Sequence, residues 1–261
     1  ALEMPLGTTV NGQATKDTGD YFKFEGKKGQ RIIIEGWGRR IDSKIDATLS
    51  VYDASGKELQ SNRDTYRLDP FIDFLVPENG IYTVKIYDYL YRGGPEYSYR
   101  LSIGIQPHIE YIFPPAGLPG TRQQYVVYGQ NLPGSVPSSI MNSNGIPLEE
   151  KKVEISIPNK SEQTPLLSLL KPSQIVIDAK DHQIISSKGT SNSFSLQVAT
   201  APVILENEPN NKKSQAQKVK LPCEINGQFF PNKDVDWIIF EAKKDHLYWI
   251  EVFSHRMGLS T

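Results

Sequence analysis

The sequence predicts an all-β protein built from small β-sandwich modules, and three observations carry this prediction. Apolar and polar residues alternate with a period of two through the first hundred residues, as in strands that bury one face. Gly, Asn, Asp and Pro interrupt this alternation roughly every 8–12 residues, which is typical of short antiparallel strands in a sandwich. A ten-residue stretch that begins at Asp20 recurs 216 residues later at Asp236, which indicates a modular array.

The first module, residues 1–106, is expected to be a jelly-roll-like sandwich. Its turns use Gly, Asn, Asp, Ser and Pro, residues that accept a positive φ or favour turn geometry. We expect strands at 20–25, 30–36, 47–52, 70–76, 80–88 and 97–103.

The second module, residues 107–202, is also expected to be a β-sandwich. Strands are predicted at 123–128, 152–157 and 193–199. The region 159–191 is poorly patterned, and residues 166–170 fit one or two helical turns or a strand equally well.

The third module, residues 203–261, starts with a polar linker, 206–213, which contains a Pro and no apolar residue. Strands are predicted at 237–242 and 247–253. The repeat places Thr261 just before the counterpart of the strand at 47–52, so we expect the chain to be a fragment that stops inside a module.

Apolar side chains of this third module would lack a covering sheet. Trp237, Ile239, Trp249 and Phe253 are the examples. Unpaired strand edges are templates for pairing with another chain, so residues 219–261 are expected to pack against a second copy, as a swapped or edge-paired homodimer, or against the neighbouring domains. The alternative is that the covering residues belong to the intact molecule.

Composition excludes several functional classes. A formal net charge of −1 argues against nucleic-acid binding, which needs a concentrated positive surface. No apolar run approaches the roughly 20 residues needed to cross a bilayer, so no membrane insertion is expected. Cys223 is the only cysteine, so neither an intrachain disulfide nor a cysteine-based zinc site can form.

Two stretches resemble the bacterial pre-peptidase C-terminal (PPC) domain family, small jelly-roll-like sandwiches attached to large exported proteins. Residues 203–261 carry the entry pattern Glu206-x-Glu208-Pro209-Asn210-Asn211, then Gly227-Gln228-Phe229, then Asp234-x-Asp236-Trp237-x-x-Phe240. Residues 10–106 are similar in Asp46-Ala47-Thr48-Leu49-Ser50-Val51-Tyr52-Asp53 and in Pro77-Glu78-Asn79-Gly80-Ile81-Tyr82. Residues 107–132 look like the start of an Ig-like domain of the IPT/TIG type.

The resemblance implies a calcium site, because some family members hold the ion between the acidic linker and the loop before the Asp-x-Asp strand. Only hard oxygen ligands are present there, and calcium takes six to eight of them. The competing interpretation is that these side chains solvate a flexible linker and make turn hydrogen bonds. No calcium is expected in the first module, where Thr18 replaces an aspartate. The candidate ligands are Glu206, Glu208, Asn210, Asn211, Asp234 and Asp236.

Aromatic residues suggest a ligand-binding face on the first module. Period-two alternation places Tyr87, and then Tyr89, on the side of the strand that carries Lys85. With Arg92 nearby, these tyrosines could stack on a sugar ring or anchor a protein partner. The competing interpretation is that they cover the sheet edge or pack on a neighbouring domain.

The resemblance implies a non-enzymatic function, and no catalytic nucleophile motif, histidine metal-ligand spacing or phosphate-binding loop stands out in the sequence. The resemblance implies accessory modules of a larger protein that is secreted, periplasmic or at the cell surface. Such modules position another domain or bind an extracellular protein or polysaccharide. The alternatives are the C-terminal appendage of a secreted peptidase or hydrolase, and a carbohydrate-binding module.

Overall fold

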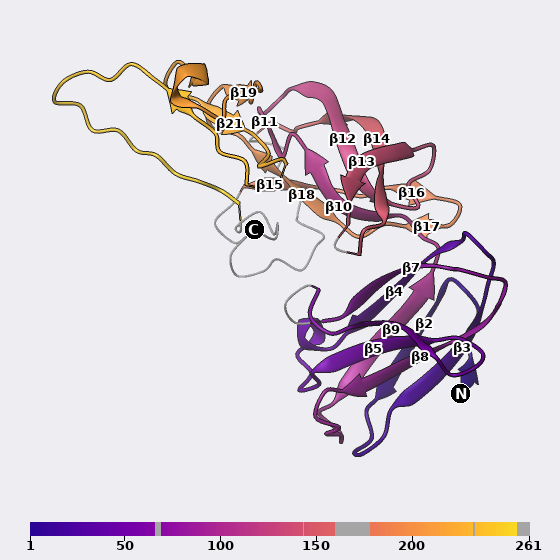
Figure 1. Cartoon of the computed structure of the whole chain (residues 1–261). Helices are drawn as coiled ribbons and strands as arrows, with labels where there is room; N and C mark the ends of the chain where they lie inside the picture. The colour runs from indigo at the N-terminus through magenta and orange to yellow at the C-terminus, as the bar shows by residue number, and fades with distance from the viewer. Residues whose placement is uncertain (66–68, 143, 160–177, 232, 255–261) are drawn as a thin grey trace. The chain divides into compact units, whose positions relative to one another are not determined.

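The computed structural model describes residues 1–65, 69–142, 144–159, 178–231 and 233–254, and within them all regular structure is β except for short 3₁₀ turns (Figure 1). The predicted all-β class is therefore confirmed. Residues 166–170, for which helix and strand were both open, lie outside the described residues. No helix in the described ranges is long and apolar enough to cross a membrane.

The chain forms two compact units. The first comprises residues 1–108 together with 184–191, and the second comprises residues 109–183 and 192–261.

The first unit contains two sheets, whose strands are antiparallel except for the parallel pair β1–β3. One has the strand order β1-β3-β8-β5-β6 and the other β2-β9-β4-β7. Six of these strands match the predicted ones to within a residue at each end. β1, β2 and β6 were missed, because β1 is two residues long and the other two are largely polar. The bounds are β1 Leu2–Glu3, β2 Thr8–Gln13, β3 Asp20–Gly26, β4 Arg31–Trp37, β5 Ala47–Tyr52, β6 Glu58–Asn62, β7 Phe71–Leu75, β8 Gly80–Asp88 and β9 Ser98–Gly104, with a hairpin of β16 Ile185–Ser186 and β17 Gly189–Thr190.

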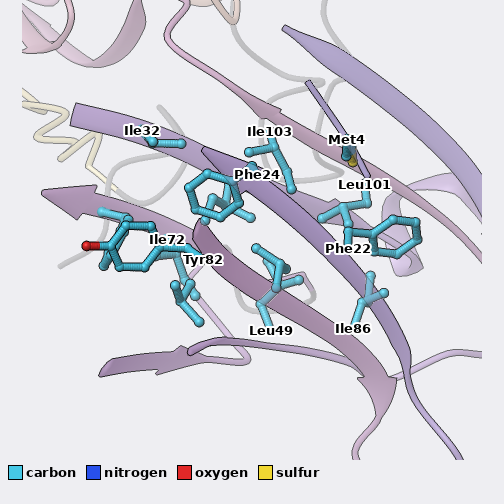
Figure 2. Close-up of a cluster of buried hydrophobic side chains, with 14 of the residues drawn as sticks. Met4, Phe22, Phe24, Ile32, Leu49, Ile72, Tyr82, Ile86, Leu101 and Ile103 are labelled. Atoms are coloured by element: carbon cyan, nitrogen blue, oxygen red, sulfur yellow. The ribbon is translucent and has the colours of Figure 1, made fainter. Parts of the chain in front are cut away.

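The core of the first unit lies between these sheets (Figure 2). Alternation along β3 turns Phe22 and Phe24 inward, and the ring of Phe24 stacks on Tyr82 of β8 with centroids 5.8 Å apart. Phe74 of β7 meets the Tyr82 ring edge-on at 5.2 Å. Burying a side chain of this size contributes about 1.5–3 kcal/mol, so this cluster fixes which face of each strand is left for solvent and ligands.

The second unit holds a four-stranded sheet of order β10-β12-β14-β13 and a three-stranded sheet of order β11-β18-β15. β12, β14 and β18 overlap the predicted strands, whereas β13 was not predicted, because its sequence lacks regular alternation. The bounds are β10 His108–Phe113, β11 Ala116–Gly117, β12 Arg122–Gln130, β13 Val136–Met141, β14 Pro147–Ser156, β15 Ala179–His182 and β18 Phe194–Val198.

The end of the chain contributes two short parallel ladders. β19 (Val203–Leu205) pairs with β21 (Glu224–Asn226), and β20 (Gln217–Lys218) pairs with β22 (Ile238–Ile239). The predicted strand at 247–253 was wrong, because these residues are described and carry no strand. A strand requires a neighbouring ladder, and apolar sequence alone does not supply one.

The repeated sequence makes the same local structure twice. In the first unit, the Met4 N–H donates to the Lys23 carbonyl at 2.8 Å beside the parallel β1–β3 pair. Near the C-terminus, the Val219 N–H donates to the Ile239 carbonyl at 3.0 Å beside the parallel β20–β22 pair. Met4 and Val219 are both buried. The triplets Asn11-Gly12-Gln13 and Asn226-Gly227-Gln228 extend the correspondence.

Candidate functional site

Three carboxylates from two separate segments meet at the entry to the C-terminal part of the chain. Glu206 and Glu208 follow β19, and Asp236 precedes β22. One oxygen of each lies within 4.8 Å of the others. Such close like charges repel each other unless a proton or a cation neutralises them.

Asn210 is hydrogen-bonded to two of these carboxylates. It is fully buried, its Nδ2 donates to Glu206 Oε1 at 3.1 Å, and its backbone N–H donates to Glu208 Oε2 at 2.9 Å. Its carbonyl accepts the Trp237 N–H at 2.9 Å, which joins the linker to the residue just before β22. The Oδ1 atoms of Asn210 and Asp236 are buried and have no hydrogen-bond partner among the described residues. A buried oxygen without a hydrogen-bond partner destabilises the folded state. A cation or donor bound at this point would remove that cost by pairing with both atoms.

The cluster raises the pKa of Asp236 to about 6. Burial is the main cause, followed by the hydrogen bond and charge of Glu206 and by the charges of Asp234 and Glu208. A bound divalent cation would act in the opposite direction, because it favours the ionised carboxylate.

Gly227 allows Glu206 to take its place in the cluster. A Cβ at Gly227 would lie 2.9 Å from Glu206 Oε2. The same Oε2 accepts the N–H of Gln228 at 2.8 Å. The carboxylate therefore lies against the backbone, where any larger residue would displace it.

Two of the six predicted ligands have other roles. Asn211 Nδ2 donates to Asp234 Oδ1 at 2.8 Å. The Asp234 carboxylate also accepts the N–H groups of Phe230 and Val235, each at 2.9 Å. The structure thus places Glu206, Glu208, Asn210 and Asp236 together, whereas Asn211 and Asp234 fasten the loop beside them.

The tyrosines predicted to share a face are separated in the structure. Tyr87 is on the outer face of β8 beside Lys85, whose Nζ lies 4.2 Å from its ring centroid. β8 ends at Asp88, so Tyr89 leaves the sheet, and its ring stacks under the guanidinium of Arg63 with Cζ 3.7 Å from the ring centroid.

Arg92 is held by Asp88. Its Nε and Nη2 donate to the two carboxylate oxygens at 2.9 and 3.0 Å. Burial would raise the pKa of Asp88, but the hydrogen bonds from Arg92 and from the N–H groups of Asp46, Leu90 and Arg92 outweigh it and lower the pKa to about 2. Arg92 therefore supports the turn after β8.

Two further residues belong with Lys85 and were missed from sequence. Tyr91 has a φ of 55° and returns its ring to Tyr87, with centroids 5.0 Å apart. Its hydroxyl accepts a hydrogen bond from Lys85 Nζ at 3.1 Å. Tyr21 is paired with Lys85 across β3 and β8. Knowledge of the β3–β8 register would have placed Tyr21 beside Lys85. The position of Tyr91 depends on its left-handed backbone conformation, which the sequence did not indicate.

Comparison with known proteins supports the resemblance for part of the chain. Residues 18–88 match the family described as bacterial pre-peptidase C-terminal domain. A probable subtilase-type serine protease of Deinococcus radiodurans is 37% identical over 68 residues, which cover 26% of this chain and 9% of that protein. The chain thus matches only a small part of that relative.

Solved structures to which the chain shows some similarity include the pre-peptidase C-terminal domain of a collagenase from Bacillus anthracis. It is 20% identical, with a TM-score of 0.33, over 39% of this chain and 92% of that chain. Periplasmic inhibitors of g-type lysozyme, both named PliG, are 17% identical in Aeromonas hydrophila and 11% in Salmonella Typhimurium, with TM-scores of 0.30 and 0.29. These matches cover 40% of this chain and 95% and 97% of those chains.

Proposed function

We propose that this chain consists of non-catalytic accessory modules of a larger exported bacterial protein, which position another domain or bind an extracellular ligand. The observation that carries the proposal is the family match of residues 18–88. The relative from Deinococcus radiodurans, described as a probable protease, supports attachment to a secreted enzyme. The location proposed is accordingly outside the cytoplasm, either secreted, periplasmic or at the cell surface.

The proposal extends to the remaining modules. The matching ladders β1–β3 and β20–β22 support a second PPC-like copy that begins at residue 203. The sheets β10-β12-β14-β13 and β11-β18-β15 support an Ig-like module between the copies.

Reading the gene on both sides of this coding segment tests the proposal. We expect an export signal and at least one further domain, either catalytic or adhesive. The purified chain should show no hydrolysis across a panel of peptide, ester and glycoside substrates. Turnover by the purified chain, or a gene without export signal and further domains, would contradict the proposal.

We also propose calcium as the ion for the acidic cluster. Glu206, Glu208, Asn210 and Asp236 offer carboxylate and amide oxygens, the ligands calcium prefers, and water would complete the six to eight positions. A bound ion would neutralise the three carboxylates and join the linker to Asp236, which precedes β22. The first unit supports this assignment by contrast: Asp20, the counterpart of Asp236, accepts the Tyr99 hydroxyl at 2.5 Å.

A further inference from the structure

The outer face of the sheet β3–β8–β5 carries a cation in an unusual setting. Phe22, Val84 and Leu49 point into the core, so their neighbours along each strand point outward. In register, Tyr21 of β3, Lys85 of β8 and Ser50 of β5 form one row across the sheet. Lys85 is therefore at the centre of the face.

The ammonium of Lys85 is held by aromatic rings. Its Nζ lies 4.2, 5.1 and 5.8 Å from the ring centroids of Tyr87, Tyr91 and Tyr21, respectively. By contrast, Lys28, Lys44 and Lys218 each pair with a glutamate, whereas no ion pair of Lys85 occurs among the described residues.

Packing below Lys85 fixes its position. A Cβ at Gly19 would lie 2.7 Å from Lys85 Cε and 3.2 Å from Tyr87 Cβ. Thr48 and Ser50 point outward but are only 4% and 1% exposed, so neighbouring groups cover this part of the sheet. The cation is thus placed in advance of any ligand, which lowers the entropy cost of binding.

The charge of Lys85 favours an anionic partner, because no carboxylate is paired with it among the described residues. Lys23, exposed on β3 two residues from Tyr21, is instead opposite Glu3 of β1 in the ladder, so its charge is balanced. The carboxylates Glu25 and Glu58 are farther along β3 and on the edge strand β6, and Glu58 Oε2 already accepts the Tyr52 hydroxyl at 3.0 Å. The whole chain has a net charge of −1, so any attraction for a polyanion must be local.

We propose that this face binds an acidic polysaccharide of uronic acids, with Lys85 contacting a carboxylate and Tyr21 stacking on a sugar ring. Tyr21 and Tyr91 remain 44% and 39% exposed, and a tyrosine offers an apolar ring surface beside a polar tip. Tyr21 is the cross-strand neighbour of Lys85, whose Nζ lies 5.8 Å from the Tyr21 ring centroid, so the stacking surface and the cation are side by side on the face. This inference rests on the proposed binding role and narrows its ligand.

The test is affinity electrophoresis of the full chain through gels that contain alginate or polygalacturonate, with neutral dextran and poly-glutamate as comparators. We expect retardation by the acidic glycans at about 20 mM salt, and weaker retardation at 150 mM because screening shortens the range of the charge contact. Lys85→Met should weaken binding about tenfold or more, as expected for loss of a charged contact. Tyr21→Ser, at an exposed position, should also weaken it, and Lys85→Arg should retain most of it.

Lys27→Met, in an exposed turn, is the matched control and should bind like wild type. The melting temperature of each variant shows that it is folded. Absence of retardation in wild type, equal retardation of Lys85→Met and wild type, or equally strong and Lys85-dependent binding of poly-glutamate would overturn the glycan assignment. Each of these results leaves the gene-neighbourhood test of the accessory role unaffected.

Discussion

The backbone carbonyl of Asn210 accepts the N–H of Trp237 at 2.9 Å, so the acidic linker is joined to the segment before β22 that contains its partner carboxylate, Asp236. The Nδ2 of the same residue donates to Glu206, and its buried Oδ1 has no partner among the residues that the structure describes. A single ion at this point would connect segments that are otherwise joined by a few backbone hydrogen bonds.

Calcium should therefore stabilise the C-terminal part of the chelator-treated chain. Binding to the folded state alone contributes about 2.7 kcal/mol at a hundredfold excess over the dissociation constant. Millimolar calcium should raise the unfolding temperature measured by calorimetry. Asp236→Asn should abolish this response, whereas Glu241→Gln, at an exposed carboxylate outside the cluster, should preserve it. An unchanged transition in wild type would exclude the calcium site.

Without calcium, the raised pKa of Asp236 gives a defined pH dependence. The folded pKa of about 6 exceeds the ordinary value of 3.8, so between these values the folded state binds more protons than the unfolded state. The stability contribution of this group therefore falls as pH rises from about 4 to 6. Urea titrations in chelator should show this decline, and Asp236→Asn should flatten it. A decline of equal size in the variant would assign the effect to other groups.

Substitutions of Asp88 and of Arg92 should lower the free energy of unfolding by very different amounts. Asp88 is buried and accepts three backbone N–H groups, so Asp88→Ala should cost about 3 kcal/mol or more. Arg92 is 41% exposed at its side chain, so Arg92→Gln should cost about 1 kcal/mol. Denaturant unfolding compares the two variants, and equal losses would show that the ion pair dominates over the backbone contacts.

Acid should also weaken the contribution of Asp88. Its folded pKa, near 2, is below the ordinary value of 3.8, so its stabilisation is present above about pH 4 and is lost as pH falls toward 2. Asp88→Asn should reduce the acid sensitivity of the first unit between these values, as measured by near-ultraviolet circular dichroism. An identical acid transition would contradict this assignment.

The exposed apolar residues near the C-terminus should promote self-association. Leu247, Trp249, Ile250 and Val252 are 93, 86, 76 and 74% exposed. Contiguous apolar surface of this kind favours protein contacts. We expect a dimer by light scattering at about ten micromolar, with Trp249→Ser shifting the balance toward monomer. A monomeric wild type with this segment resistant to protease would exclude the dimer.

Period-two alternation predicted strands well where a strand has a buried face and a partner. β5 and β8 were predicted at their observed bounds, because their inward residues form the core. β6 was missed because a polar edge strand leaves a weak pattern. Residues 247–253 show the opposite error, since their apolar sequence indicated a strand that has no ladder.

The candidate sites were predictable to a smaller extent. The linker and the Asp-x-Asp pattern indicated an oxygen-rich site, but only the structure separates Asn210, buried at its centre, from Asn211, which fastens a loop. Pair geometry of this kind depends on backbone turns that residue types do not specify. The same applies to Tyr91, which joins Tyr87 only through a residue with positive φ.

The corresponding aspartates Asp20 and Asp236 differ in their hydrogen bonding, because the hydroxyl of Tyr99 donates to Asp20 alone. In the first unit the Tyr99 ring packs against Gly12, and its hydroxyl donates to the Asp20 carboxylate, which therefore already has a partner there. At the C-terminal counterpart, Glu206 lies against Gly227, and no donor from the described part of the chain reaches Asp236 Oδ1. The first unit would therefore keep its structure in surroundings depleted of divalent ions, while residues 203–254 would respond to them. One chain would thus combine a sandwich whose stability is independent of divalent ions with a segment whose stability depends on them.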